Sequence, residues 1–216
     1  MKTHIILLGP PGAGKGTQGQ LIGEKLNIPF ISSGDALREE FGGNTEIAEK
    51  FKKYINAGLL VPDDVVEEFI ETLLDKYNLE KGFIFDGFPR TVHQAGFIMD
   101  YLKAKNIPLD VVLYLSIPDE EVVKRISGRR ICPKCGAVYN IYFNPPKNDN
   151  LCDKCGAKLV QRDDDKENVV EKRIKVYEKE TAPLIEFFKE KQLLKEIDAV
   201  GSVESVQYRI QEVLNG

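Results

Sequence analysis

The sequence has no long apolar run. No stretch approaches the ~18 apolar residues that a membrane-spanning helix needs, and the first run, Ile5 to Leu8, is broken by Gly9, Pro10 and Pro11. This run is also too short for the apolar segment of a signal peptide. We therefore expect a cytoplasmic protein with no membrane partner.

A strong excess of one charge is also missing. The 216 residues include 30 Lys and Arg and 34 Asp and Glu, which gives a formal net charge of −4. A general nucleic-acid binder needs a strongly basic face, so the balance argues against nucleic acid as a partner. An anionic substrate is still compatible with it, because local clusters of Arg and Lys focus positive potential even on an acidic protein.

No cysteine is left unpaired in the pattern. All four lie in two C-x-x-C pairs, Cys132 with Cys135 and Cys152 with Cys155. Without a secretory signal, such pairs favour metal binding over disulfides. The C-x₂-C-x₁₆-C-x₂-C spacing fits tetrahedral Zn²⁺, and four thiolates leave no open position, so the predicted zinc is structural. Redox-active pairs and unliganded thiols are the alternatives.

Short apolar runs alternate with longer helical patterns. Ile5 to Leu8, Phe83 to Phe85 and Val111 to Leu115 are typical of strands buried on both faces of a parallel sheet, and Pro29 to Ile31 and Leu193 to Ile197 are weaker candidates. The alternation with helical patterns predicts an open α/β fold with helices on both faces of the sheet.

Three details of the helical patterns can be tested. Asp64 and Glu67 have the spacing of a capping box at the start of one helix. The stretch from Val169 to Lys191 predicts a long helix that Pro183 kinks or divides. Residues 32–61, which hold mostly helical pieces, and residues 128–162, which hold every cysteine, are interpreted as insertions over the ligand-binding edge of the sheet.

A glycine-rich loop follows the first predicted strand. Residues 9–17 read G-P-P-G-A-G-K-G-T and open a helix, which is the context of a phosphate-binding loop. Its backbone N–H groups can surround an anion, and Lys15 can reach the β- and γ-phosphates. Gly16 separates Lys15 from Thr17, which weakens a direct role for this hydroxyl on Mg²⁺. The alternative is an ordinary strand–helix turn.

A second candidate segment ends the Phe83–Phe85 strand. It reads Asp86-Gly-Phe-Pro-Arg90 and stands where open α/β sheets bind ligands. The planar guanidinium of Arg90 suits a phosphate, whereas the alternative is a turn with a surface arginine. Earlier in the chain, Ser33 and Asp35 are suitable helix caps with Arg38 one turn on, although this segment by itself could be a plain helix start.

These motifs together resemble the adenylate kinase family, whose loop reads G-x-P-G-x-G-K-G-T with the same shifted threonine. The resemblance runs nearly end to end. It implies a P-loop three-layer α/β/α fold with a five-stranded parallel sheet, whose core comprises residues 1–31, 62–127 and 163–216. It also implies a helical segment that binds the nucleoside monophosphate at 32–61 and a zinc-binding lid at 128–162. The implied reaction is the reversible, Mg²⁺-dependent transfer ATP + AMP = 2 ADP, carried out by a monomer.

The resemblance also implies roles for individual residues. Those expected at ATP are Gly12, Ala13, Gly14, Lys15, Gly16, Thr17, Arg129, Val138, Tyr139 and Gly201. Those expected at AMP are Ser33, Arg38, Leu59, Leu60, Val61, Gly87, Phe88, Pro89, Arg90, Gln94, Arg162 and Arg173. The expected catalytic residues are Lys15, Arg90, Arg129, Arg162 and Arg173, with Asp86 near hydrated Mg²⁺. Asp164 and Asp165 are expected to pair with the arginines around the lid.

Two other functions share part of this pattern. A related kinase could use UMP, CMP or GMP as acceptor, or GTP as donor; Ser33 and Gln94 make AMP the favoured acceptor. A zinc-ribbon nucleic-acid binder with an ATPase core is the second alternative, and the acidic balance and the Asp86–Arg90 segment argue against it.

Overall fold

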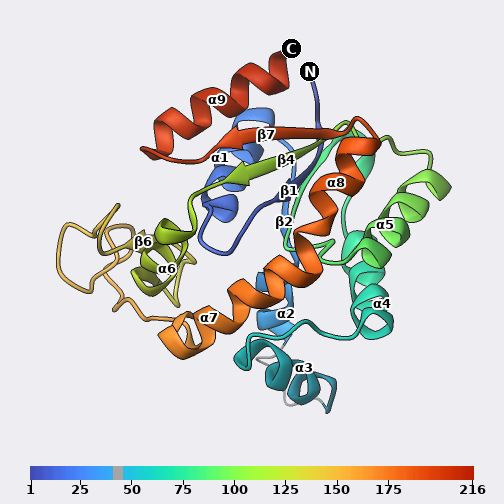
Figure 1. Cartoon of the computed structure of the whole chain (residues 1–216). Helices are drawn as coiled ribbons and strands as arrows, with labels where there is room; N and C mark the ends of the chain where they lie inside the picture. The colour runs from blue at the N-terminus through green and yellow to red at the C-terminus, as the bar shows by residue number, and fades with distance from the viewer. Residues whose placement is uncertain (41–45) are drawn as a thin grey trace.

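A central parallel sheet organises the chain, whose computed structural model describes residues 1–40 and 46–216 (Figure 1). Within this part of the chain, five strands lie in the order β2-β3-β1-β4-β7, and every neighbouring pair is parallel. Their bounds are β1 His4–Leu8, β2 Phe30–Ser32, β3 Phe83–Asp86, β4 Val111–Ser116 and β7 Leu194–Asp198. The parallel arrangement brings the carboxyl ends of all five strands to one edge.

Helices cover both faces of the sheet. Ile5 and Leu7 of β1 belong to one apolar cluster, together with residues of α1 (Lys15–Leu26) and α9 (Val203–Asn215). Ile6 and Leu8 belong to the other, with residues of α4 (Asp63–Leu74), α5 (Val92–Ala104) and α8 (Pro183–Glu190). Each fully buried Ile, Leu or Phe contributes about 1.5–3 kcal/mol to the stability of the fold. Because successive side chains of β1 point to opposite faces, this strand packs against both helical layers.

Two helices follow β2 and form a small cluster outside the main layers. They are α2 (Ser33–Glu40) and α3 (Glu46–Asn56). Leu37 and Phe51 are buried against each other, with Val61 and Phe69 packed beside them. Because Phe69 lies in α4, this small cluster anchors the two helices to the main core.

A second appended unit follows α6 (Asp119–Ser127). It starts with the antiparallel ribbon of β5 (Arg129–Ile131) and β6 (Val138–Asn140). Its core is built from Cys132, Tyr139, Cys152 and Leu159.

The chain returns to the sheet through an interrupted helix. After a 3₁₀ turn at Asp163–Asp165, α7 (Glu167–Val176) runs into a π-helical turn at Tyr177–Thr181, and α8 begins at Pro183. The predicted division at Pro183 is confirmed. A further 3₁₀ turn, Leu79–Lys81, precedes β3.

The predicted fold class and all five strand candidates are confirmed, but two helix starts differ from prediction. The capping box at Asp64 and Glu67 is wrong: α4 begins at Asp63 after Pro62 and has no side-chain cap. Asp63 instead accepts a hydrogen bond from the distant Gln94. Likewise, Ser33 does not cap α2, because the Asp35 N–H donates to Ser32 Oγ at 3.2 Å.

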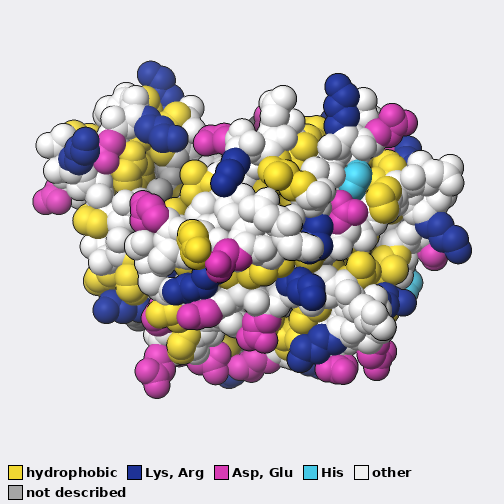
Figure 2. All heavy atoms as spheres, turned by 90° about the horizontal axis from the view of Figure 1, so that it is seen from above, with side chains coloured by type: hydrophobic (Ala, Val, Ile, Leu, Met, Phe, Trp, Pro, Cys, Tyr) yellow, Lys and Arg dark blue, Asp and Glu magenta, His cyan; other side chains and the backbone are white. Residues whose placement is uncertain are grey.

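Charged side chains of both signs are interspersed over the face that Figure 2 shows. Within the described residues, no helix is long and apolar enough to cross a membrane.

Candidate active site

The loop between β1 and α1 fits tightly against the neighbouring strand. A Cβ atom on Gly9 would lie 2.5 Å from the carbonyl oxygen of Leu115 at the end of β4, so only glycine fits there. Gly12 and Gly14 have φ angles of 82° and 90°, which glycine adopts without strain. The loop residues Gly12, Ala13, Gly14, Gly16 and Thr17 therefore stand at the start of α1, where N–H groups and the helix dipole favour an anion.

Lys15 folds back over this loop. Its Nζ donates hydrogen bonds to the carbonyl oxygens of Gly9 at 2.7 Å and Pro10 at 2.9 Å. Burial lowers the pKa of Lys15 to about 8, and the attraction of Asp86 opposes this shift only partly. The ammonium group is therefore short of counter-charge, and an anion on the loop would supply it.

The turn after β3 packs against the start of α2. Gly87 has φ 87°, and a Cβ atom there would lie 2.6 Å from Ser33 Oγ. The Ser33 hydroxyl donates to the carbonyl oxygen of Asp86 at 3.1 Å. These contacts join two predicted AMP-binding segments that are about fifty residues apart in the sequence.

Asp86 faces the start of α1. A Cβ atom on Gly16 would lie 3.9 Å from its Oδ2. The side chain keeps some contact with solvent, yet surrounding protein desolvates it and raises its pKa, while Lys15 and Arg90 act in the opposite direction. A carboxylate in this position is a suitable partner for a hydrated hard cation.

Arg90 keeps contact with solvent although surrounding protein desolvates its guanidinium, and hydrogen bonds hold both its side chain and its backbone. Its Nε donates to Gly87 O at 2.7 Å, its N–H donates to Gln94 Oε1 at 2.7 Å, and its carbonyl oxygen accepts from the Thr181 hydroxyl at 2.9 Å. Desolvation, followed by the charge of Arg173, lowers the pKa of Arg90 to about 10, so the guanidinium stays charged at neutral pH.

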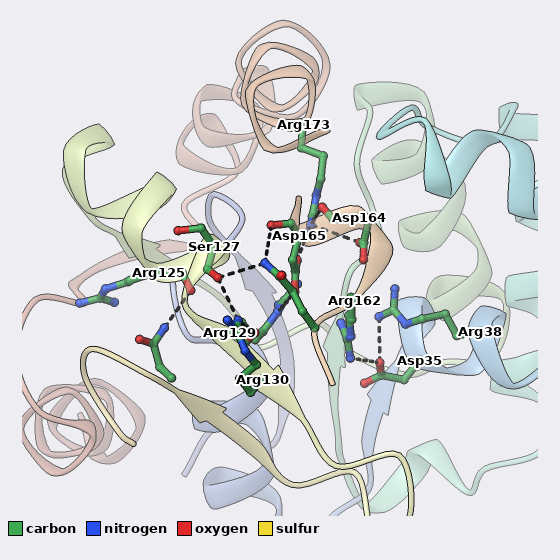
Figure 3. Close-up of polar contacts among 12 residues, drawn as sticks. Asp35, Arg38, Arg125, Ser127, Arg129, Arg130, Arg162, Asp164, Asp165 and Arg173 are labelled. Atoms are coloured by element: carbon green, nitrogen blue, oxygen red, sulfur yellow. Dashed lines mark hydrogen bonds and ion pairs between the residues drawn. The ribbon is translucent and has the colours of Figure 1, made fainter. Parts of the chain in front are cut away.

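Asp165 links two arginines from opposite ends of the cysteine-rich segment (Figure 3). Arg129 Nε donates to its Oδ2 at 2.8 Å, and Arg173 Nη1 donates to its Oδ1 at 3.0 Å. Arg173 also lies 3.2 Å from Asp164 Oδ2. The predicted pairing of Asp164 and Asp165 with these arginines is confirmed for Arg129 and Arg173.

Arg162 pairs with a different carboxylate. Its Nη2 lies 2.9 Å from Asp35 Oδ1, which Arg38 Nη2 also approaches to 2.8 Å (Figure 3). Desolvation acts to raise the pKa of Asp35, but Arg38 and Arg162 together lower it below its usual value. One carboxylate thus holds two guanidinium groups together, and these belong to segments far apart in the sequence.

Cations outnumber carboxylates in the site as a whole. The cations are Lys15, Arg38, Arg90, Arg129, Arg162 and Arg173, and the carboxylates among them are Asp35, Asp86, Asp164 and Asp165. The excess positive charge suits a ligand that carries several phosphates.

The remaining predicted nucleotide contacts differ in exposure. Phe88 and Pro89 are buried, Leu59 is exposed, and Leu60 and Val61 are half-buried. Gly201, with φ 112°, is exposed in the turn before α9. Val138 is exposed, whereas Tyr139 is 7% exposed in the lid core and its hydroxyl accepts from the Asp153 N–H at 2.8 Å.

Sequence reasoning missed three residues at the site. Arg125, near the end of α6, lies beside the glycine loop: its Cβ would be 3.3 Å from a Cβ atom on Gly12, and its guanidinium donates to the Ala199 carbonyl oxygen at 3.1 Å. Asp63 and Thr181 contact the Arg90–Gln94 segment only through tertiary structure. No local motif distinguishes them.

The four cysteines form one cluster. Their sulfur atoms all lie within 4.8 Å of one another, with Cys132–Cys155 at 3.4 Å and Cys135–Cys152 at 3.5 Å. Each C-x-x-C pair closes a turn in which a glycine N–H, of Gly136 or Gly156, donates to the carbonyl oxygen of the first cysteine. The sequence pattern has thus placed four possible thiolate ligands around one point.

Comparisons with known proteins agree with these motifs. A family model described as "Adenylate kinase" matches residues 7–193. The chain is 49% identical over 211 residues to an adenylate kinase of Archaeoglobus fulgidus, covering 98% of this chain and 97% of the relative. It is 48% identical over 214 residues to that of Acholeplasma laidlawii, covering 99% of both. An adenylate kinase of Thermoanaerobacter pseudethanolicus is 49% identical over 211 residues, with 98% and 97% coverage.

Proposed function

The chain belongs to the adenylate kinase family of phosphotransferases, and we propose that it catalyses ATP + AMP = 2 ADP with Mg²⁺ bound to ATP. The observation that carries the proposal is the gathering of six cationic side chains beside the carboxyl edge of the sheet. Phosphoryl transfer depends on alignment and charge neutralisation more than on a protein nucleophile. The AMP phosphate is itself the attacking group.

ATP binds on the glycine loop in this proposal. Backbone N–H groups of residues 12–17 surround the phosphates, and Lys15 exchanges its carbonyl partners, Gly9 and Pro10, for phosphate oxygens. The base then lies towards Gly201 and the lid residues Val138 and Tyr139.

AMP binds between α2 and the turn after β3. Arg38 and Arg90 hold its phosphate, and Ser33 lies where these two segments meet. The backbone of residues 59–61 and 87–89 borders the nucleotide, and Gln94 faces the base. The observation in favour is that the Ser33 hydroxyl already joins the two segments.

The transferring phosphoryl group lies between the two nucleotides. Arg129, Arg162 and Arg173 neutralise its charge, and Asp164 and Asp165 hold Arg129 and Arg173 in position. Adenylate kinases use Mg²⁺ with ATP, and the bound ion would lower the negative charge of the phosphates. Asp86 is the residue that would hold its hydration shell, because its carboxylate faces the start of α1.

A structural Zn²⁺ fits the four cysteines. Zn–S bonds of about 2.3 Å place tetrahedral sulfurs roughly 3.8 Å apart, and the distances of 3.4 and 3.5 Å between sulfurs are close to this value. The ion replaces the apolar core that so small a segment lacks. It takes no part in the transfer.

Residues 32–61 and 128–162 act as closing units on a core of residues 1–31, 62–127 and 163–216. The apolar cluster within residues 128–162 supports this division for the cysteine-rich unit, and closure over the phosphates excludes water as a competing acceptor. Because one chain supplies every proposed site residue, we propose a monomer. Free thiols that bind zinc favour a reducing, cytoplasmic setting, and the near balance of charge argues against a nucleic-acid partner.

The test is ADP formation from ATP with AMP, UMP, CMP or GMP, and with GTP in place of ATP. We expect AMP with ATP to be the preferred pair. Arg90→Ala is expected to lower turnover about 10³-fold or more, by analogy with other phosphate-binding arginines, while its circular dichroism stays unchanged. Arg90→Lys, which keeps the charge and loses the planar fork, is expected to recover little. Near-normal rates in Arg90→Ala would refute the assignment.

A further inference from the structure

The amide of Gln94 is held at both of its ends. The side chain is 2% exposed. Its Oε1 accepts the Arg90 N–H at 2.7 Å, and its Nε2 donates to Asp63 Oδ1 at 2.6 Å. Asp63 stands at the start of α4, some thirty residues away in the sequence, so the two helices α4 and α5 meet at this contact.

These two contacts allow only one orientation of the amide. The reversed amide would place Oε1 against the Asp63 carboxylate and the NH₂ group against the Arg90 N–H, and both arrangements are repulsive. The hydrogen bond to a charged carboxylate is the stronger of the two. The carboxylate is fixed in turn, because the Thr91 hydroxyl lies 3.3 Å from Asp63 Oδ2.

A fixed amide distinguishes the two purine patterns. Adenine presents an N6 amino donor beside an acceptor nitrogen, which an amide matches through its oxygen and its NH₂ group. Hypoxanthine and guanine present the reverse order, an O6 acceptor beside an N1–H donor. An amide that can turn over accepts either pattern, whereas a locked one leaves polar groups unpaired against the wrong base.

We propose that Asp63 is a positioning residue that sets the base preference of the acceptor site by locking the Gln94 amide. This inference rests on the proposed function, in which Gln94 faces the AMP base. Asp63 itself does not touch the nucleotide, because its effect passes through Gln94.

Inosine monophosphate (IMP) is the sharpest probe, since it differs from AMP only in the hydrogen-bonding pattern around C6 and N1. Asp63→Asn keeps the volume, but its amide can donate as well as accept, so only the weaker contact with the Arg90 N–H still opposes the reversed Gln94. We expect the ratio of kcat/KM for AMP to that for IMP to fall at least tenfold. The KM for ATP should stay within twofold of the wild-type value, whereas a general structural defect would change it as well. Asp64→Asn, the exposed neighbouring carboxylate, is the matched control and should leave the ratio unchanged.

A second pair of variants separates this inference from the proposed function. Gln94→Ala should lower the AMP-to-IMP ratio, and adding Asp63→Asn to it should change the ratio less than twofold. If Asp63→Asn alone keeps the wild-type ratio while Gln94→Ala lowers it, the lock is refuted and the proposed function stands. If the wild-type protein forms no ADP from ATP and AMP, the proposed function itself has failed. Should Asp63→Asn melt below the assay temperature, Asp63→Glu provides the comparison: it keeps an acceptor-only carboxylate and should retain preference for AMP.

Discussion

Replacing Asp165 by asparagine removes the shared counter-ion of two arginines. The Asp165 side chain is 0% exposed and accepts hydrogen bonds from both Arg129 and Arg173. Asparagine has nearly the same volume and keeps one oxygen acceptor, so packing is preserved. The substitution removes the negative charge and replaces one of the two carboxylate oxygens that accept hydrogen bonds from Arg129.

The magnitude follows from burial. Removing one partner of a buried ion pair costs about 3–5 kcal/mol, because the other charge is left without compensation. Here Arg129 and Arg173 are 21% and 20% exposed, so water offsets part of the loss. We therefore expect about 3 kcal/mol, which corresponds to a fall in Tm of roughly 6–12 °C for a chain of this size. Turnover should fall as well, since both arginines lose their orientation.

Asp163 is the matched control in the same 3₁₀ turn. It is 73% exposed and pairs with Lys166 at 2.7 Å, and an exposed pair of this kind contributes about 0–1 kcal/mol. Thermal unfolding followed by circular dichroism, with initial rates on the same samples, compares Asp165→Asn with Asp163→Asn. If both variants melt within about 2 °C of the wild type, Asp165 does not stabilise the two arginines.

Two other predictions concern Lys15 and the cysteines. Bound phosphates favour charged Lys15, and the pKa of Lys15 in the free protein is lowered to about 8. The affinity for a non-hydrolysable ATP analogue, measured by calorimetry, should therefore be constant below pH 8. Above pH 8 it should fall by up to about tenfold per pH unit. Constant affinity from pH 7.5 to 9.5 would contradict this, and Lys15→Arg should flatten the profile. Metal analysis should find one Zn²⁺ per chain, and its removal should open residues 128–162 to proteolysis and lower the Tm. Equal protease resistance with and without the metal would exclude a structural ion.

Local patterns predicted the strands because a strand that is buried on both faces consists almost entirely of apolar residues. β1, β3 and β4 are nearly continuous runs of apolar residues, and each was found within one residue of its expected position. The cysteine spacing likewise predicted a cluster that the sulfur distances now describe. In both cases neighbours in the sequence carry the whole signal.

The helix starts failed for the opposite reason. A capping box is a local rule, yet α4 starts one residue before Asp64. The Asp63 carboxylate there binds Gln94 of α5 and Thr91, the residue before α5, in place of the first turn of its own helix. Ser33 likewise donates its hydroxyl to β3 instead of capping α2. The contacts of Arg162 with Asp35 and of Thr181 with Arg90 also join distant segments, and no window of the sequence contains both partners.

The carboxylates around the arginines divide into two kinds, and the division bears on how a nucleotide enters. Asp165 is fully buried and pairs with Arg129 and Arg173, so no water is available to replace these two contacts. Asp35 is 55% exposed and holds Arg38 and Arg162 through a single oxygen. Water can solvate Asp35 once these arginines turn to a phosphate, so the exchange costs little. The buried carboxylate fixes geometry, and the exposed one is a counter-ion that a phosphate can replace.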